Sequence, residues 1–521
     1  MTNVVGPMDF STFVHRELTF APMVDILRGA GFDLSEARSS HRTLLDTADG
    51  RLFSAGLTLQ VVSTTGDHPE TAHMHLEQDG SIPATITVEA IPRMAEDLPA
   101  GPLGTRLRKL LDVRALLPLV TFDVRAATAV ERDSDGRASA AVTVTDEIVL
   151  HEPGTAARVP CTVTITPALG QPKPAERISD QLLALGFERS SSDLLGLVTD
   201  AAVVDRRGIR YEASVPLEPH MPAGAGFRAV LINLLDTIEA NWQGTIADLD
   251  TEFLHDLRVA VRRTRSVIGQ AKRVLPESLR GRYRDDFAWL AGATGPTRDL
   301  DAYALEWPRY VADMSDGNDA LQPVLDHILR HRHVARAELV AVLESERAHT
   351  LLAEWRIAMA TEPVDRPSHA DERLGVALAK RFRQAHQTVL HQGRLIDSES
   401  PAEHLHDLRK DAKKLRYLVE CFASAMPDKL LRRFVKQLKG LQDNLGEHQD
   451  AEVHAEELTT VGQELSEEHA PQATLIALGA LTERLEQSQH AARAEFVERF
   501  AAYDSADTQR IVDALIEALE Q

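Results

Sequence analysis

The chain is poor in cysteine and has no long apolar run. Its 521 residues include two cysteines, Cys161 and Cys421, which form no Cys-x-x-Cys pair. This usage suits a reducing compartment and argues against a disulfide framework and a cysteine-ligated zinc site. No segment approaches the roughly 18 apolar residues of a membrane-spanning helix, and the first residues lack the basic and apolar regions of an export signal. We therefore expect a cytoplasmic protein that does not contact a membrane.

Cations are in the minority as well. The sequence contains 57 Lys and Arg against 79 Asp and Glu, which gives a formal net charge of −22. The surface as a whole is therefore not that of a nonspecific nucleic-acid binder. A local basic groove in such negative surroundings would favour a dense, linear anion over weaker ones. The hydrophobic fraction of 43% and the charged fraction of 26% are those of a globular protein, and the length predicts two or three domains.

One pattern occurs twice in the chain: a histidine followed by four cations. The first copy is His255, Arg258, Arg262, Arg263 and Arg265. The second copy lies 151 positions later and is His406, Arg409, Lys413, Lys414 and Arg416. A second block repeats at the same offset, because residues 295–299 and 446–450 both begin with Gly and end with Asp. The duplication has kept a basic surface in an acidic protein, which is typical of polyanion binding.

Helical periodicity places these cations opposite an apolar stripe. At about 100° per residue, most of the cations fall on one side of each helix. The apolar positions on the other side are Leu254, Leu257, Val261 and Ile268 in the first copy and Leu405, Leu408, Leu415 and Val419 in the second. The alternative is an ordinary solvated helix face. Such a face usually mixes charges of both signs, whereas these two are almost purely cationic and both keep the histidine.

The secondary structure predicted from the sequence changes near residue 215, from strands to helices. Alternating or β-branched segments at 57–62, 84–89, 140–145 and 161–166 predict strands, and residues 133–136 predict a hairpin turn. Helices are expected at about 103–112 and 175–186. We predict domains at 1–215 and 225–521, joined by a Pro- and Gly-rich linker at 216–224. A break at 361–369 divides the second domain into helical repeats at about 225–362 and 370–521.

The helical region resembles the CHAD family, the conserved histidine α-helical domain. The resemblance rests on both His-Asp-Leu-Arg blocks, on residues 415–420 and on the two Gly-to-Asp segments. It implies two four-helix bundles related by a pseudo-twofold axis, with a basic groove between them that binds inorganic polyphosphate. Carried onto this sequence, the implied binding residues are His255, Arg258, Arg262, Arg263, Arg265, His406, Arg409, Lys410, Lys413, Lys414, Arg416, Arg432, Arg433, Lys436 and Lys439.

The chemistry of these residues suits polyphosphate. The planar fork of arginine holds two phosphate oxygens at once, and lysine adds a compact charge. Histidine can donate to phosphate; its alternative role is metal ligation, which the surrounding cations disfavour. We therefore expect no metal, no cofactor and no catalytic residue. Asp299 and Asp450 can either hold the groove arginines as acceptors or cap a helix after the preceding glycine, and we favour a structural role.

The N-terminal segment resembles the CYTH or triphosphate-tunnel superfamily, whose members process triphosphates inside an antiparallel barrel. Asp46, Thr47, Leu52, Gly56 and Leu59 carry the scaffold resemblance. The functional motif of the superfamily is incomplete in this sequence. The expected Glu-x-Glu-x-Lys strand reads His15-x-Glu17-x-Thr19, and two expected arginines are replaced by Gln60 and Val62. The strand expected to be acidic, at 162–166, has no carboxylate, and an expected lysine is missing near Leu197. With Glu17, Arg125 and Asp146 left, the resemblance implies a degenerate, non-catalytic tunnel.

The expected fold is α+β and multidomain, with an antiparallel β-barrel followed by the two helical bundles. Three functions compete. The first is a polyphosphate-binding protein beside an inactive tunnel, with granule association, storage control or regulation of a polyphosphate enzyme as its outcome. The second is a metal-dependent triphosphate or polyphosphate hydrolase. The third is a binder of nucleic acid or another polyanion, although base recognition favours aromatic side chains among the cations and Tyr417 is the only one beside either block.

Overall fold

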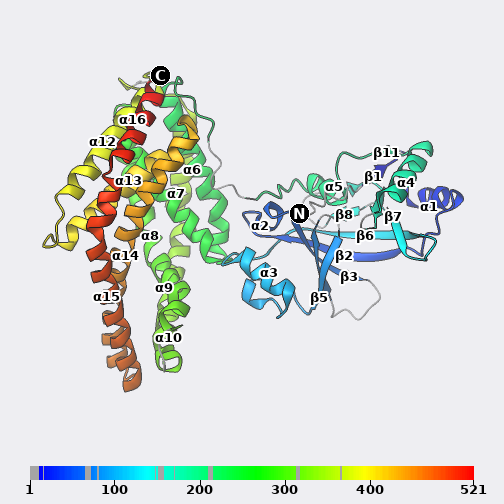
Figure 1. Ribbon diagram of the computed structural model, residues 1–521, viewed down its shortest axis with the longest axis horizontal. Coiled ribbons are helices and arrows are strands. Elements are labelled where there is room, and N and C mark those ends of the chain that lie inside the picture. The colour runs from blue at the N-terminus through cyan, green and yellow to red at the C-terminus, as the bar shows by residue number, and fades with distance from the viewer. Residues whose placement is uncertain are drawn as a thin grey trace. The chain divides into compact units, whose positions relative to one another are not determined.

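The chain divides into two compact units, Met1–Arg210 and Tyr211–Gln521. The structure is a computed structural model, shown in Figure 1. It describes residues 11–15, 17–64, 72–78, 81–146, 148–150, 158–168, 171–208, 215–312, 317–363 and 367–521. None of the helices in these ranges combines the length and the apolar composition needed to cross a membrane.

The first unit is built on one antiparallel sheet. Its strands are β1 (Ser11–Val14), β2 (Arg38–Asp46), β3 (Leu57–Thr64), β4 (Ala72–Gln78), β5 (Ser81–Val88), β6 (Leu117–Arg132), β7 (Ala138–Thr145), β8 (Ile148–Leu150), β9 (Arg158–Val159), β10 (Thr162–Pro167) and β11 (Glu188–Arg189). The order is β11-β1-β10-β7-β6-β2-β3-β4-β5, with β8 paired to β6 and β9. Within the described residues β5 and β11 do not pair and the sheet is open, so the predicted barrel is not confirmed.

The four strands expected from alternation are confirmed as β3, β5, β7 and β10. The turn at 133–136 is confirmed too, because the Asp133 N–H donates to the Arg137 carbonyl at 2.8 Å between β6 and β7. Gly136 has a φ of +77° there, in the left-handed region that glycine adopts at low cost. Local hydrophobic alternation and turn chemistry were therefore sufficient to place these elements.

Five helices pack on the sheet: α1 (Phe20–Gly29), α2 (Arg51–Ser54), α3 (Pro102–Leu111), α4 (Pro172–Ala184) and α5 (Leu194–Ala201). The start of α2 depends on Asp46, which is 3% exposed and accepts hydrogen bonds from the Leu52 and Phe53 N–H groups, both at 2.9 Å. Burial raises the pKa of this carboxyl, and the backbone donors partly offset the effect. The scaffold residue Asp46 therefore has a folding role.

The second unit is helical throughout its described length. Its helices are α6 (Ala223–Ile246), α7 (Thr251–Gln270), α8 (Glu277–Ala293), α9 (Gly295–Ala312), α10 (Gly317–Leu343), α11 (Glu346–Ala360), α12 (Leu374–Arg394), α13 (Ala402–Cys421), α14 (Asp428–Glu467), α15 (Gln472–Tyr503) and α16 (Ala506–Glu520). Figure 1 runs through them from green to red. The sequence offset of 151 reappears in the helix starts, since α6, α7 and α8 begin 151 residues before α12, α13 and α14.

A proline explains why the two repeats differ after this point. The first repeat has α8 and α9, interrupted at Thr294, where the second has the single helix α14 of 40 residues. Pro296 follows the interruption, and proline lacks the N–H that a continuous helix would use. The equivalent position in the second repeat is Glu447, which keeps its N–H and lies inside the continuous helix α14. The same duplicated segment therefore forms two helices in one repeat and one helix in the other.

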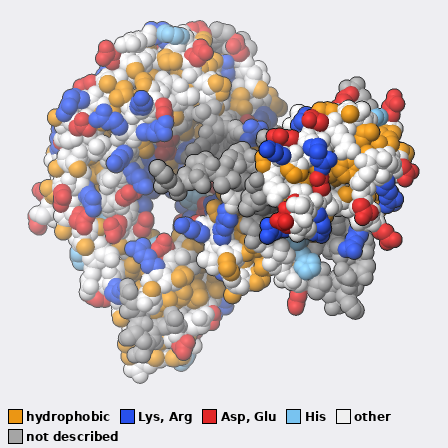
Figure 2. All heavy atoms as spheres, turned by 45° about the vertical axis from the view of Figure 1, so that its right-hand side comes forward, with side chains coloured by type: hydrophobic (Ala, Val, Ile, Leu, Met, Phe, Trp, Pro, Cys, Tyr) orange, Lys and Arg blue, Asp and Glu red, His pale blue; other side chains and the backbone are white. Residues whose placement is uncertain are grey.

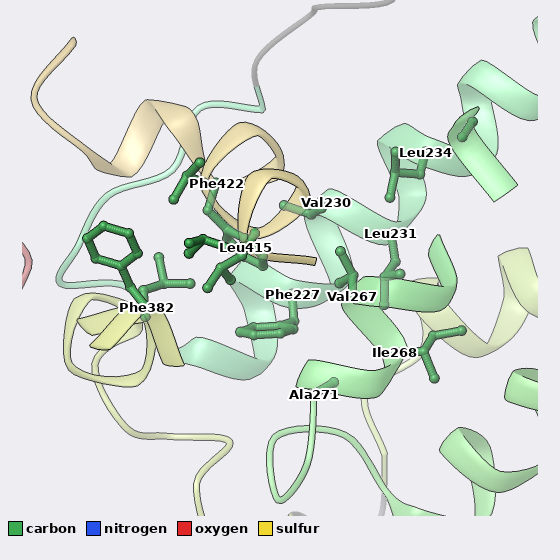
Figure 3. Packing of buried hydrophobic residues seen from close by; sticks show 14 of the residues in the cluster. Phe227, Val230, Leu231, Leu234, Val267, Ile268, Ala271, Phe382, Leu415 and Phe422 are labelled. Carbon is green, nitrogen blue, oxygen red and sulfur yellow. The ribbon is translucent and has the colours of Figure 1, made fainter. Parts of the chain in front are cut away.

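One hydrophobic core joins the two repeats. Figure 3 shows Phe227, Val230 and Leu231 of α6 near Leu415 of α13 and the following Phe422. The Phe227 and Phe422 ring centroids are 4.7 Å apart. Leu217 also belongs to this core at 5% exposure, so part of the stretch expected to be a linker packs on the helical unit. The two repeats are therefore held together by a shared hydrophobic core.

Candidate functional site

The duplicated blocks form helices α7 and α13, which pack against each other. Asp250 caps α7, because its carboxylate accepts from the Glu252 N–H at 2.9 Å and from the Phe253 N–H at 3.2 Å. The expected apolar stripes are confirmed as buried: Leu257 and Leu408 are both 0% exposed. The cations of each helix are therefore directed away from the core.

Two arginine–aspartate pairs repeat with the sequence. Arg258 Nη2 lies 3.5 Å from Asp299 Oδ1, and Arg409 Nη2 lies 2.7 Å from Asp450 Oδ1. Asp299 is inside α9 and Asp450 is deep inside α14, so neither is a helix cap. Burial raises the pKa of Asp299, while Arg258 acts in the opposite direction. The structural, helix-capping role that we favoured for these aspartates is therefore wrong, and the structure supports the other role considered, an acceptor that orients an arginine.

A cavity of about 890 Å³ lies where both repeats meet. Helices α7, α9, α13, α14 and α15 line it. Five of the sequence-predicted binding residues are brought together in its wall: Arg258, Arg262, His406, Arg409 and Lys413. We call these five residues the cationic wall. It combines residues of the two copies, which are far apart in sequence.

The cationic wall is electrostatically crowded. Burial, together with the neighbouring Arg409 and Arg262, lowers the pKa of Lys413 to about 8, with Asp450 acting in the opposite direction. Burial also lowers the pKa of Arg258, with Asp299 opposing and Arg262 and Arg298 contributing. Cations in this situation favour an incoming anion, because it offsets both their desolvation and their mutual repulsion.

Much of the remaining cavity wall is acidic or aromatic. It includes Tyr303, Glu306, Tyr310, His454 and Glu457. The Tyr310 hydroxyl lies 2.5 Å from His454 Nδ1, and the Tyr303 ring centroid is 4.3 Å from that of His454. Burial raises the pKa of both tyrosines and lowers that of His454. Sequence reasoning missed these residues, although Glu306 and Glu457 are 151 positions apart and so repeat at the offset of the duplicated blocks.

The two repeated histidines have equivalent neighbours. Arg298 Nε donates to His255 Nδ1 at 3.2 Å, and His406 Nδ1 donates to Gln449 Oε1. Positions 298 and 449 are again 151 apart. Sequence reasoning missed Arg298, although its position next to Asp299 in the second repeated block could have indicated it. Arg298 lies outside the cavity lining, whereas Arg309 and Arg484 line the cavity and carry no such signal.

The other predicted cations lie outside the lining of this cavity. Arg263 Nη2 is 2.7 Å from Glu420 Oε2, and Arg416 Nε is 2.5 Å from Glu420 Oε1. Four more form ion pairs: Lys410 with Asp407, Lys414 with Asp411, Arg432 with Asp428 and Arg433 with Asp507. Arg265, Lys436 and Lys439 are exposed. On the face drawn in Figure 2, Lys and Arg side chains lie among Asp and Glu side chains, so positive charge does not cover it.

In the first unit, the three charged residues left of the expected tunnel motif are Glu17, Arg125 and Asp146. Glu17 is exposed and follows β1, which ends at Val14. Arg125 Nη2 lies 2.5 Å from Asp146 Oδ2, and its guanidinium carbon is 4.7 Å from the Phe20 ring centroid. These partners leave Arg125 neutralised by Asp146.

A different set of charged residues gathers on one face of the sheet, and sequence reasoning missed it. Gln60 Nε2 donates to Glu77 Oε2 at 3.3 Å, and Arg206 Nη2 donates to Thr58 Oγ1 at 2.8 Å. Burial raises the pKa of Glu77 and lowers that of Arg42, and each residue opposes the shift of the other. The Gln60 that replaces an expected arginine therefore sits beside a carboxylate.

The sequence model of the CHAD domain family matches residues 229–459, which confirms a CHAD domain there. No curated protein matches the chain. Among solved structures, the CHAD domain of the plant Ricinus communis is similar, with a TM-score of 0.42, 23% identity and coverage of 59% of this chain and 95% of its own. PptA from Streptomyces chartreusis has a TM-score of 0.42 and 18% identity, covering 54% and 99%. HpAC1 from Hippeastrum, described as having a dominant triphosphatase activity, has a TM-score of 0.28 and 13% identity, covering 37% and 94%.

Proposed function

We propose that the CHAD domain at residues 229–459 makes this protein a binder of inorganic polyphosphate, with the cationic wall as the binding surface. The observation that carries the proposal is the crowding of Arg258, Arg262, Arg409 and Lys413, drawn from both repeats, in one cavity. An isolated solvated helix face would not bring cations of two distant segments together. The two-repeat bundle with a shared groove, implied by the family resemblance, is part of the same proposal.

The geometry suits a chain of phosphates. Arg258 and Arg409 are oriented by Asp299 and Asp450, so their forks are held in place before an anion arrives. Preorganised donors lose less conformational entropy on binding than free side chains. Each arginine can hold two phosphate oxygens, while Lys413 supplies a compact charge between them. An extended polyanion would neutralise several of these cations at once and release its counterions.

The proposal includes binding without hydrolysis. A metal-dependent hydrolase needs carboxylates that hold the metal against the phosphates. In the cavity, Asp299 and Asp450 are paired with arginines. In the sheet unit, Asp146 is paired with Arg125, and Glu17 is exposed. We accordingly propose that the first unit is a non-catalytic relative of the triphosphate tunnel.

The test is a titration of the full chain with fluorescently labelled polyphosphate of defined length, followed by fluorescence anisotropy. We expect saturable binding that the combined variant Arg262→Glu and Lys413→Glu abolishes. Arg284→Glu is the matched control: it reverses one exposed cation of α8 that lies outside the cavity and pairs only locally with Asp285 at 3.1 Å. Competition with RNA and DNA at fixed salt separates the proposal from general polyanion binding, because either would displace polyphosphate equally well if the site recognised charge alone.

A further inference from the structure

A group of three potential metal ligands lies outside the cavity, between α10 and α14. His327 and His331 are one turn apart on α10, and Glu464 comes from α14. His327 Nε2 lies 2.7 Å from Glu464 Oε2, and the two imidazole centroids are 4.2 Å apart. One ligand atom from each residue lies within 4.8 Å of the others. Within the described residues, no other group of three or more His, Cys, Asp or Glu side chains lies close enough together to hold one metal ion.

We infer that these three residues form a binding site for a divalent transition cation, for which Zn²⁺ is the best-suited probe. Two imidazoles and a carboxylate are a donor set that zinc accepts, with water in the fourth position. Histidines four residues apart lie on the same helix face and can share one ion. Ligand atoms of a tetrahedral zinc ion are roughly 3.4 Å apart, so a small rotation of the exposed His331 side chain is enough to close the group.

The surroundings of His327 hold its Nε2 atom beside the Glu464 carboxylate. The side chain is 2% exposed, so its direction is fixed by packing. On the other side of the ring, Arg330 Nη2 is 3.3 Å from His327 Nδ1 and 3.2 Å from Glu468 Oε2. Glu468 therefore balances the charge of Arg330, and Glu464 leaves the group with a net negative charge. Ligation through Nε2 places the imidazole proton on Nδ1, so Arg330 then donates to Glu468 alone, and Glu468 Oε1, 4.0 Å from Nδ1, lies on the side where it can move to accept that proton.

A bound ion would connect the two repeats. Apolar residues of α10 already pack against α14 beside the group, with Leu321 and Ile328 near Leu458 and Leu465. A hydrogen bond alone would require only His327 and Glu464; His331 adds a third donor on the exposed side. Because α14 also lines the cavity, a metal here would stiffen one cavity wall without contributing a ligand to polyphosphate. The inference is independent of the proposed function.

The experiment uses the full chain after treatment with a chelator and desalting. Isothermal titration with Zn²⁺ should show one strong site, and Co²⁺ should give the visible absorption of a tetrahedral complex that Zn²⁺ then displaces. Saturating Zn²⁺ should also raise the melting temperature, because it binds the folded state. Absence of a stoichiometric strong site would overturn the inference.

Three variants locate the ion. His331→Ala should weaken Zn²⁺ binding by about 10-fold or more, and it changes an exposed side chain. Glu464→Gln can keep a hydrogen bond to His327 but loses the charge, so it should lose the zinc-dependent rise in melting temperature while remaining folded by circular dichroism. His333→Ala, an exposed histidine of the same helix, is the control and should bind Zn²⁺ as the parent does. Unchanged zinc affinity in both His331→Ala and Glu464→Gln would contradict the site.

Discussion

Arg263 Nη2 of the first repeat lies 2.7 Å from Glu420 Oε2 of the second, and the same carboxylate accepts from Arg416 Nε at 2.5 Å. One acidic side chain thus connects cations from both duplicated helices. Both Arg263 and Glu420 are only partly exposed, at 26% and 21%. The guanidinium of Arg263 also lies 5.9 Å from the Tyr417 ring centroid, within reach of a cation–π interaction.

This relationship predicts an effect on stability. Glu420→Ala leaves two partly buried guanidinium groups without their shared acceptor, and we expect a loss of about 1–2 kcal/mol in the free energy of unfolding. Arg263→Ala should cost less, since Arg416 keeps its partner. Denaturant titration of both single variants and of the double variant measures the coupling. If Arg263→Ala instead lowers the affinity for polyphosphate and leaves the free energy of unfolding unchanged, Arg263 belongs to the binding surface.

The repeat symmetry predicts comparable effects at equivalent positions. Arg262→Glu and Lys413→Glu are 151 apart and both line the cavity. Each reversal removes an attraction and adds a repulsion, so each should weaken polyphosphate binding by about 1–3 kcal/mol. The slope of log affinity against log salt should fall in each variant, because fewer counterions are released. Leu257→Ala and Leu408→Ala should lower stability and leave that slope unchanged. An effect confined to one repeat would contradict a shared groove.

The lowered pKa of Lys413, about 8 in the free protein, predicts a dependence on pH. Below pH 8 the amine is charged and contributes to binding. As the pH rises through 8 the free protein loses this proton, and a bound polyanion must restore it, so affinity should fall. Lys413→Arg keeps its charge and should flatten the profile measured by anisotropy between about pH 7 and 10. An equally steep fall in this variant would assign the titration to another group.

The lowered pKa of Lys413 also predicts the direction in which the free energy of unfolding changes with pH. The unfolded lysine titrates near its ordinary value of 10.5, above the folded one. Between these values the unfolded chain binds more protons, so the contribution of Lys413 to the free energy of unfolding should increase with pH in that window. Denaturant titrations of the parent and of Lys413→Met, compared across pH, isolate this contribution; a decrease with pH would contradict the lowered pKa.

The two units should separate in function. A fragment of residues 215–521 should bind long-chain polyphosphate about as tightly as the full chain, since the cationic wall lies within it. The fragment begins before Leu217, which belongs to the helical core. A fragment of residues 1–208 should bind little. Loss of most affinity in the helical fragment, with its circular dichroism intact, would show that the sheet unit contributes to the site.

The protein should release no phosphate from nucleoside triphosphates, inorganic triphosphate or polyphosphate with Mg²⁺ or Mn²⁺. The physical reason is the pairing of Asp146 with Arg125 and the exposure of Glu17. A malachite-green assay measures the release. Turnover that Glu17→Gln abolishes would show that the sheet unit retains a working triphosphate site.

Local patterns in the sequence determined much of this protein. The period of the apolar positions was enough to bury Leu257 and Leu408, and alternation was enough to place β3 and β7. The exact repeat predicted equivalent helices, because duplicated residues form the same local hydrogen bonds. Pro296 then explains why α8 and α9 are separate helices where the second repeat continues as α14, since its effect is also local.

Only the tertiary structure decided which cations meet. Arg262 and Arg263 are neighbours in sequence, but successive helical residues point about 100° apart. One therefore lines the cavity and the other reaches Glu420 in the second repeat. A helical pattern gives the direction of a side chain around its own axis and not the helix that it faces. The open sheet has the same cause: whether β5 and β11 pair depends on contacts between distant segments, which no local pattern encodes.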